Sequence, residues 1–71
     1  MYNVYILMSE LNGRFYIGSC IDITERLAYH NSGRALSTKA YTPWKLVYSE
    51  TYDTLSEARK REYQIKSWKN P

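Results

Sequence analysis

A single carboxylate is the most informative side chain in this sequence. Glu62 lies on the apolar stripe of a predicted helix, at helical spacing from Ala58 and Ile65. Because burying an unpaired carboxylate is costly, an inward-facing Glu62 needs a partner. It could form a salt bridge to Arg26 or another basic group, lie at the edge of the stripe, or hold a divalent cation. A lone acidic ligand suits Mg²⁺, which keeps several waters and takes further oxygens from a phosphate.

Arg26 and His30 form a second candidate pair, because residues four apart in a helix lie on the same face. Arginine presents a planar fork of donors that matches phosphate oxygens, and histidine can bind a phosphate or relay a proton near neutral pH. An arginine and a histidine on a helix can also form a polar edge without any ligand. The spacing alone leaves both interpretations open.

Two of the eight tyrosines, Tyr5 and Tyr16, are predicted on one face of a β-hairpin, beside Gly18. Tyrosines on a sheet ordinarily serve as packing residues. Beside a metal or another cation, the pKa of a phenol falls and its oxygen can act as a general base. The two tyrosines therefore have both a structural and a catalytic interpretation.

The hairpin is predicted from two β-rich segments, 2–9 and 14–20, joined by Asn12-Gly13. If these two residues are the whole loop, position 11 pairs with position 14, and Tyr5 pairs with Cys20. In this register one face is a core surface formed by Val4, Ile6, Met8, Phe15 and Ile17. The other face is predicted to be open and polar-tipped, with Tyr5, Leu7, Ser9, Tyr16, Gly18 and Cys20.

Capping patterns predict two helices. Asp22 with Glu25 begins a helix that runs to about residue 31 and ends before Gly33. Thr54 with Glu57 begins a second helix that runs to about residue 68. The outer faces of this second helix are predicted to carry Arg59, Lys60, Arg61 and Lys66.

A third strand is predicted over residues 44–52, with Trp44, Leu46 and Tyr48 on one face. The resulting order is β-β-α-β-α on a chain of 71 residues, which is short enough for one domain over residues 1–71. This order predicts an α+β fold (α/β in the broad sense), in which helices flank a small three-stranded antiparallel sheet.

Composition excludes several classes of protein. Cys20 is the only cysteine and His30 the only histidine, which excludes an intramolecular disulfide framework and a Cys/His zinc site. The longest apolar run, residues 4–8, is too short for a membrane span or a signal-peptide core. We therefore expect a domain of the reducing cytoplasm with no membrane partner.

Two segments carry an excess of basic residues. The segment 34–45 has Arg34, Lys39 and Lys45 and no acidic residue, and the segment from residue 54 has five basic residues against two glutamates. The chain as a whole has a formal net charge of +3. A basic segment in a small domain favours a polyanionic partner, and the alternative is a solvated surface.

Together, the order and spacing of these residues resemble the GIY-YIG nuclease domain. The second motif is intact as Tyr16-Ile17-Gly18, and the first is degenerate, since Asn3-Val4-Tyr5 keeps only its tyrosine. Arg26, His30 and Glu62 follow in the order of the family. The resemblance covers almost the whole chain and is greatest to the small stand-alone bacterial type, which is related to the nuclease domain of the excision-repair incision subunit.

The resemblance implies a metal-dependent DNA endonuclease acting on single-stranded or structured DNA. Glu62 would anchor one Mg²⁺ or Mn²⁺, and Tyr5 or Tyr16 would help to deprotonate the attacking water. Arg26 would stabilise charge that develops on the phosphate, and His30 would assist protonation or contact the phosphate. DNA would be the partner, and DNA repair is the associated process.

In the same comparison, Gly18 would permit close packing near the site, and Arg34, Lys39 and Lys45 would bind nucleic acid. This sequence departs from the family pattern at two positions: Ser19 stands where some relatives have lysine, and Asn70 lies only eight residues after Glu62. The degenerate first motif and the missing lysine favour an alternative, a nucleic-acid-binding module that does not cleave. A protein-interaction module is a third hypothesis. With no room for a separate DNA-reading domain, specificity would come from substrate shape, a homodimer or an unknown protein partner.

Overall fold

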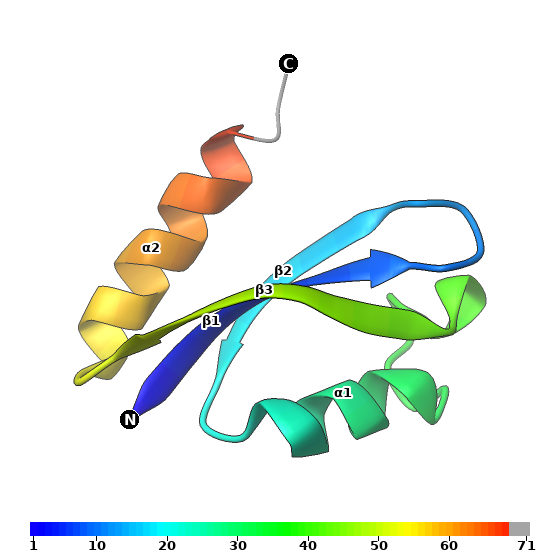
Figure 1. Cartoon of the computed structure of the whole chain (residues 1–71), viewed down its shortest axis with the longest axis horizontal. Coiled ribbons are helices and arrows are strands. Elements are labelled where there is room, and N and C mark those ends of the chain that lie inside the picture. The colour runs from blue at the N-terminus through cyan, green and yellow to red at the C-terminus, as the bar shows by residue number, and fades with distance from the viewer. Residues whose placement is uncertain (69–71) are drawn as a thin grey trace.

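The computed structural model describes residues 1–68, and in this part of the chain the elements follow the predicted order β-β-α-β-α (Figure 1). The strands β1 (Tyr2–Ser9), β2 (Phe15–Cys20) and β3 (Trp44–Tyr52) form one antiparallel sheet in the order β2-β1-β3. The helices are α1 (Ile23–Asn31) and α2 (Leu55–Trp68), and a short 3-10 helix, η1 (Lys39–Tyr41), precedes β3. The predicted fold class is confirmed, and Asn70 lies outside the described residues.

The capping residues act as their sequence patterns predict. The Asp22 carboxylate accepts a hydrogen bond from the Glu25 amide at 3.1 Å, and the Thr54 hydroxyl accepts one from the Glu57 amide at 3.2 Å. After α1 the chain turns at Gly33, whose φ of +81° lies in the left-handed region that glycine tolerates. Within residues 1–68, neither helix has the length and hydrophobicity needed to cross a bilayer.

The hairpin has a longer loop than predicted, so the expected pairing is wrong by two residues. Tyr5 pairs with Gly18, and Asn3 is the residue that pairs with Cys20. The Ser9 hydroxyl accepts hydrogen bonds from the amides of residues 11 and 12, at 3.1 and 3.3 Å, and this stabilises the wider turn. Because the pairing is shifted by an even number of residues, every side chain of β1 and β2 keeps its predicted face of the sheet.

Both faces of the sheet are covered, one by each helix (Figure 1). On the α2 face the core consists of Val4, Ile17, Ala58 and Ile65. On the opposite face Tyr5, Leu7 and Trp44 are buried, with Ile23 and Leu27 of α1 packed against them. The prediction of an open face around Tyr5 is therefore wrong, because α1 lies over it.

A β-bulge in β3 changes the predicted alternation. Leu46 pairs with Leu7, but Tyr48 pairs with Ile6, which leaves Val47 as an extra residue. Trp44 and Leu46 therefore face α1, whereas Tyr48 faces α2, contrary to the predicted single face.

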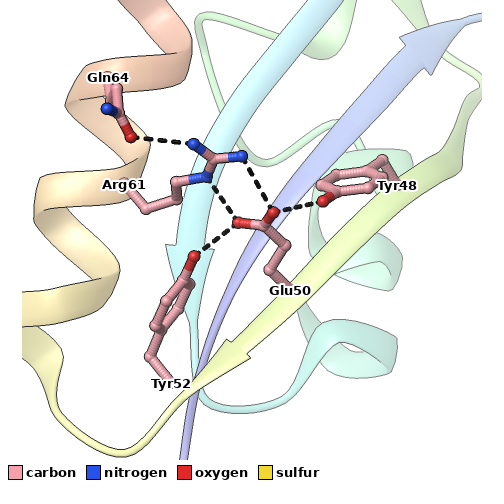
Figure 2. A network of polar contacts seen from close by, with 5 residues as sticks. All are labelled: Tyr48, Glu50, Tyr52, Arg61 and Gln64. Atoms are coloured by element: carbon pink, nitrogen blue, oxygen red, sulfur yellow. Dashed lines mark hydrogen bonds and ion pairs between the residues drawn. The ribbon is translucent and has the colours of Figure 1, made fainter.

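The bulge brings a polar network against α2 (Figure 2). Arg61 of α2 binds both carboxylate oxygens of Glu50, at 2.8 and 3.1 Å. Tyr48 and Tyr52 also donate to this carboxylate, and Gln64 accepts from Arg61 at 2.9 Å. These hydrogen bonds, chiefly those from Arg61, lower the pKa of Glu50 to about 2. Arg61, the residue directly before Glu62, therefore links α2 to β3.

Candidate active site

An open cleft of about 450 Å³ lies where the exposed edge of β2 meets the two helices. Because β2 is an edge strand, side chains from both of its faces reach this cleft. Tyr16 and Gly18 belong to the face covered by α1, and Ser19 to the face covered by α2. Residues from opposite faces of the sheet therefore line the same cleft at this edge.

Glu62 projects from α2 toward β2 and is held by two side chains. The Ser19 hydroxyl donates to Oε1 at 2.8 Å, and the Lys66 ammonium lies 2.7 Å from Oε2. The salt-bridge interpretation of Glu62 is thus observed with Lys66 rather than with Arg26. About 20% of the glutamate side chain and 52% of the lysine side chain are exposed. A solvent-accessible ion pair at this helical spacing contributes only about 0.3–0.5 kcal/mol to stability. Another cation can therefore replace Lys66 at Oε2 of Glu62.

Tyr5 reaches the cleft from β1 and connects it to a buried histidine. Its hydroxyl lies 3.3 Å from Nε2 of His30, and Nδ1 of His30 lies 3.0 Å from the Thr38 hydroxyl. His30 is only 3% exposed, so it acts from behind Tyr5 rather than from the cleft surface. Burial lowers the pKa of His30, and the Arg26 charge lowers it further. Burial also raises the pKa of the Tyr5 phenol.

The ring of Tyr5 lies directly against Gly18. A Cβ at position 18 would lie 2.7 Å from the Tyr5 hydroxyl oxygen and 2.9 Å from Cζ, closer than real Cβ contacts. It would also lie 3.2 Å from Cε1 of Tyr16. Only glycine leaves room for both rings at this edge of the sheet.

Among residues 1–68, three positively charged side chains line the cleft, one from α1 and two from α2. Arg26 extends from α1 with its guanidinium 5.5 Å from the ring centre of Tyr29. Arg59 and Lys66 lie on α2, three residues before and four residues after Glu62. Arg59 and Lys66 are exposed, as their predicted placement on the outer faces implies, and their spacing also puts them beside Glu62. The same prediction is wrong for Arg61, which turns toward the sheet and binds Glu50.

The predicted nucleic-acid-binding residues lie elsewhere. Arg34 lines a neighbouring cleft that shares Arg26 with the first one. Lys39 lies in η1 and Lys45 near the start of β3, both exposed and outside the lining of the Glu62 cleft. The structure thus brings Tyr5, Tyr16, Gly18, Arg26 and Glu62 to one cleft, with His30 behind it, and leaves Lys39 and Lys45 apart.

The donor set fits a hard divalent cation with few protein ligands. Among residues 1–68 there is no group of three or more histidine, cysteine, aspartate or glutamate side chains that could enclose an ion. Glu62 is the carboxylate that lines the cleft, and a single carboxylate suits Mg²⁺ or Mn²⁺ when water and phosphate oxygens supply the other ligands.

This chain is similar to bacterial proteins described as UPF0213 proteins. A UPF0213 protein of Staphylococcus epidermidis is 47% identical over 66 residues, which cover 92% of this chain and 79% of that protein. A UPF0213 protein of Staphylococcus aureus is 46% identical over the same length and coverage. The solution structure of a UPF0213 protein from Bacillus halodurans matches with a TM-score of 0.56 and 33% identity, covering 94% of this chain and 72% of that one.

The family comparison covers the complete sequence. The model of the GIY-YIG catalytic domain matches residues 1–71, which include both tyrosine motif positions, Arg26 and Glu62. This chain belongs to the GIY-YIG family.

Proposed function

We propose that this protein is a metal-dependent endonuclease that hydrolyses DNA phosphodiester bonds, acting on single-stranded or structured DNA. The observation that carries the proposal is the convergence of Glu62, Arg26 and Tyr5 on one cleft in a member of the GIY-YIG family. A carboxylate, a guanidinium and a phenol in one cleft supply a cation site, a phosphate clamp and a proton acceptor.

Glu62 would hold Mg²⁺ or Mn²⁺ through the oxygen that Lys66 now contacts. When bound, the cation would neutralise the scissile phosphate and stabilise the leaving oxygen. Ser19 supports this role from the other side, because its hydroxyl holds Oε1 and so limits rotation of the carboxylate.

Tyr5 is our assignment for the residue that activates water, because it lines the cleft and its hydroxyl contacts His30. A neutral imidazole can accept the phenol proton as the phenol oxygen takes a proton from water. The lowered pKa of His30 keeps the imidazole neutral at pH 7. Tyr16 is the second candidate, since it lines the same cleft and its ring centre lies 4.7 Å from that of His30.

Arg26, Arg59 and Lys66 would bind and orient the phosphate from two sides of the cleft. At the rim, Tyr63 is 79% exposed and presents an aromatic ring to solvent. Such a ring can stack on an unpaired base, which favours a substrate with single-stranded character.

A binding module without cleavage is the alternative function. The ion pair between Lys66 and Glu62 favours it, because a carboxylate that keeps this partner is not free to hold a cation. In that case the cationic cleft would bind the phosphate backbone by electrostatics alone.

The test is a cleavage assay on single-stranded, duplex, flap and branched DNA, with Mg²⁺, with Mn²⁺ and with a chelator. We expect products from at least one substrate with single-stranded character, and none in the chelator. Salt-dependent binding without products on any substrate would support the binding module instead.

A further inference from the structure

Thr38 is a buried residue outside the cleft that contacts the candidate machinery. It is 1% exposed and directly precedes η1, and its hydroxyl lies 3.0 Å from Nδ1 of His30. The indole of the buried Trp44 donates to the Thr38 carbonyl at 2.9 Å. The Thr38 amide donates to the Ala35 carbonyl at 3.1 Å. The backbone that carries this hydroxyl is therefore held on two sides.

The number of protons and acceptors around His30 determines whether the Thr38 hydroxyl donates to Nδ1 or accepts from it. A neutral imidazole has one N–H, and here it has a hydroxyl at each nitrogen, from Thr38 and from Tyr5. Thr38 has a second contact, because its hydroxyl lies 3.5 Å from the Ala35 carbonyl oxygen, which can only accept. If Thr38 donates to Ala35, its oxygen accepts Nδ1–H, and Nε2 accepts the proton of Tyr5. Each of the three protons then has an acceptor.

The opposite tautomer satisfies fewer groups. With a proton on Nε2, the ring would donate to Tyr5, and the phenol proton would depend on water in the cleft for an acceptor. Tyr5 is 2% exposed, and His30 is the side chain to which its hydroxyl is hydrogen-bonded within residues 1–68. Because so little of Tyr5 is exposed, water satisfies this donor less well than the imidazole nitrogen does, and a donor left fully unsatisfied would cost about 1–3 kcal/mol. This disfavours the arrangement.

We propose that Thr38 is a positioning residue that accepts the Nδ1 proton of His30 and thereby presents Nε2 as the acceptor of the Tyr5 phenol proton. The part of this role that concerns cleavage rests on the proposed nuclease function. Thr38 itself does not line the cleft.

The proton balance of the step follows from this tautomer. Water gives a proton to the Tyr5 oxygen while the original phenol proton passes to Nε2, so that one O–H bond breaks and one N–H bond forms. The hydroxide forms a new bond to phosphorus, and the bond from phosphorus to the leaving oxygen breaks. The imidazolium keeps both N–H groups bonded, to Tyr5 and to Thr38. Its proton then returns through Tyr5 to solvent, and a solvent proton neutralises the leaving alkoxide.

The tautomer can be measured directly, because His30 is the only histidine in the chain. Long-range ¹H–¹⁵N correlation spectra of the ¹⁵N-labelled protein at pH 8 report which ring nitrogen carries the proton. We expect Nδ1 to be protonated in the native protein and in Thr38→Ser, which keeps the hydroxyl. Thr38→Val has nearly the same shape without the hydroxyl, and it should show Nε2–H or a mixture of tautomers.

A protonated Nε2 in the native protein would overturn the proposal, and so would an unchanged Nδ1–H tautomer in Thr38→Val. If Thr38→Val does not fold, the spectra of the native protein and of Thr38→Ser still decide the question.

In cleavage assays we expect kcat of Thr38→Val to fall by about 10- to 100-fold, with KM unchanged and kcat recovered in Thr38→Ser. This loss is smaller than the roughly 10²- to 10⁴-fold that general acid–base catalysis contributes, because the substitution shifts the tautomer but keeps the histidine. A kcat of Thr38→Val equal to that of the native protein would contradict the positioning role. If the native protein cleaves no DNA, the nuclease proposal and the catalytic part of this inference fail together, whereas the spectra still test the tautomer separately.

Discussion

Tyr5 lies between a glycine that leaves it room and a histidine that binds its hydroxyl. Its ring packs on Gly18, and its oxygen reaches Nε2 of His30 at 3.3 Å. Both contacts constrain the same phenol, so the position of its oxygen depends on two residues, Gly18 and His30, that come from different elements.

Gly18→Ala should displace Tyr5. The new Cβ would lie 2.7 Å from its hydroxyl oxygen, and the rigid ring can move away only by disturbing the core. We expect a loss of about 1–3 kcal/mol in the free energy of unfolding, measured by chemical denaturation. In the background of Tyr5→Phe, which lacks that oxygen, the same substitution should cost less. Equal costs in the two backgrounds would contradict this steric account.

His30 should make the stability of the protein depend on pH. Burial and the Arg26 charge lower its pKa below the 6.5 of an unfolded histidine, so the unfolded state binds the proton first as the pH falls. The other side chains with titratable groups that face it are Tyr5, Tyr16 and Tyr29. The free energy of unfolding should therefore decrease as the pH falls below 6.5. Denaturation of His30→Gln between pH 8 and pH 5 should give a flatter profile, and an identical slope would contradict the assignment.

At the scale of secondary structure, the important element is α2, which carries Glu62 and is tied to β3. The guanidinium of Arg61 binds the Glu50 carboxylate through two nitrogens, and two tyrosines of β3 bind the same carboxylate (Figure 2). The side chain next to Glu62 is thus part of the link between helix and sheet. Movement of this helix would move the carboxylate of the site.

A double-mutant cycle of Arg61→Met and Glu50→Gln tests this link. We expect each single variant to lower the midpoint of unfolding, and the double variant to lower it by less than the sum. Because the pKa of Glu50 is lowered to about 2, the contribution of the pair should be present above pH 4.5 and be lost as the pH falls toward 2. Additive effects at pH 7 would show that the pair does not couple α2 to β3.

Local signals predict the elements of this chain well. Strand periodicity and the caps at Asp22 and Thr54 depend on neighbouring residues, and they place the helices and strands correctly. The face of Tyr48 could not be predicted in this way, because the bulge at Val47 depends on how β3 pairs with β1. The cover over Tyr5 likewise depends on where α1 packs, which no local pattern specifies.

In the candidate site, too, sequence patterns predict some residues, whereas others depend on tertiary packing. Tyr5, Tyr16, Arg26 and Glu62 were predicted from motif order, and they line one cleft. Arg59 and Lys66 were missed, although their spacing from Glu62 along the helix would have placed them beside it. Thr38 could not be found from spacing, since its contact with His30 depends on the path of the loop before η1.

At the scale of the whole molecule, positive charge is arranged around the cleft by two helices from opposite sides of the sheet. Arg26 comes from α1, whereas Arg59 and Lys66 come from α2. The local concentration of charge at this cleft, rather than the net charge of +3, is what a phosphate backbone would meet.

Arg59→Gln should therefore weaken DNA binding and reduce the salt dependence of Kd. Loss of one phosphate contact lowers the slope of log Kd against log salt by about 1. Lys60→Gln is the matched control, because Lys60 is the next residue of the same helix and lies away from the cleft. We expect the control to keep the native slope. If Lys39→Gln and Lys45→Gln reduce the slope while Arg59→Gln does not, DNA binds along the segment 34–45 instead.

The most direct test of the account compares metal-dependent DNA cleavage by the native protein, by Glu62→Gln and by Glu57→Gln. Glu57 lies on the same helix but outside the cleft, and glutamine can keep its capping contact with Thr54. Since metal coordination at a phosphate is worth several kcal/mol, we expect Glu62→Gln to reduce the cleavage rate by about a hundredfold or more, with its thermal unfolding midpoint close to the native value. Glu57→Gln should cleave at nearly the native rate. Cleavage by Glu62→Gln at the native rate would contradict the central claim that this carboxylate holds the catalytic cation.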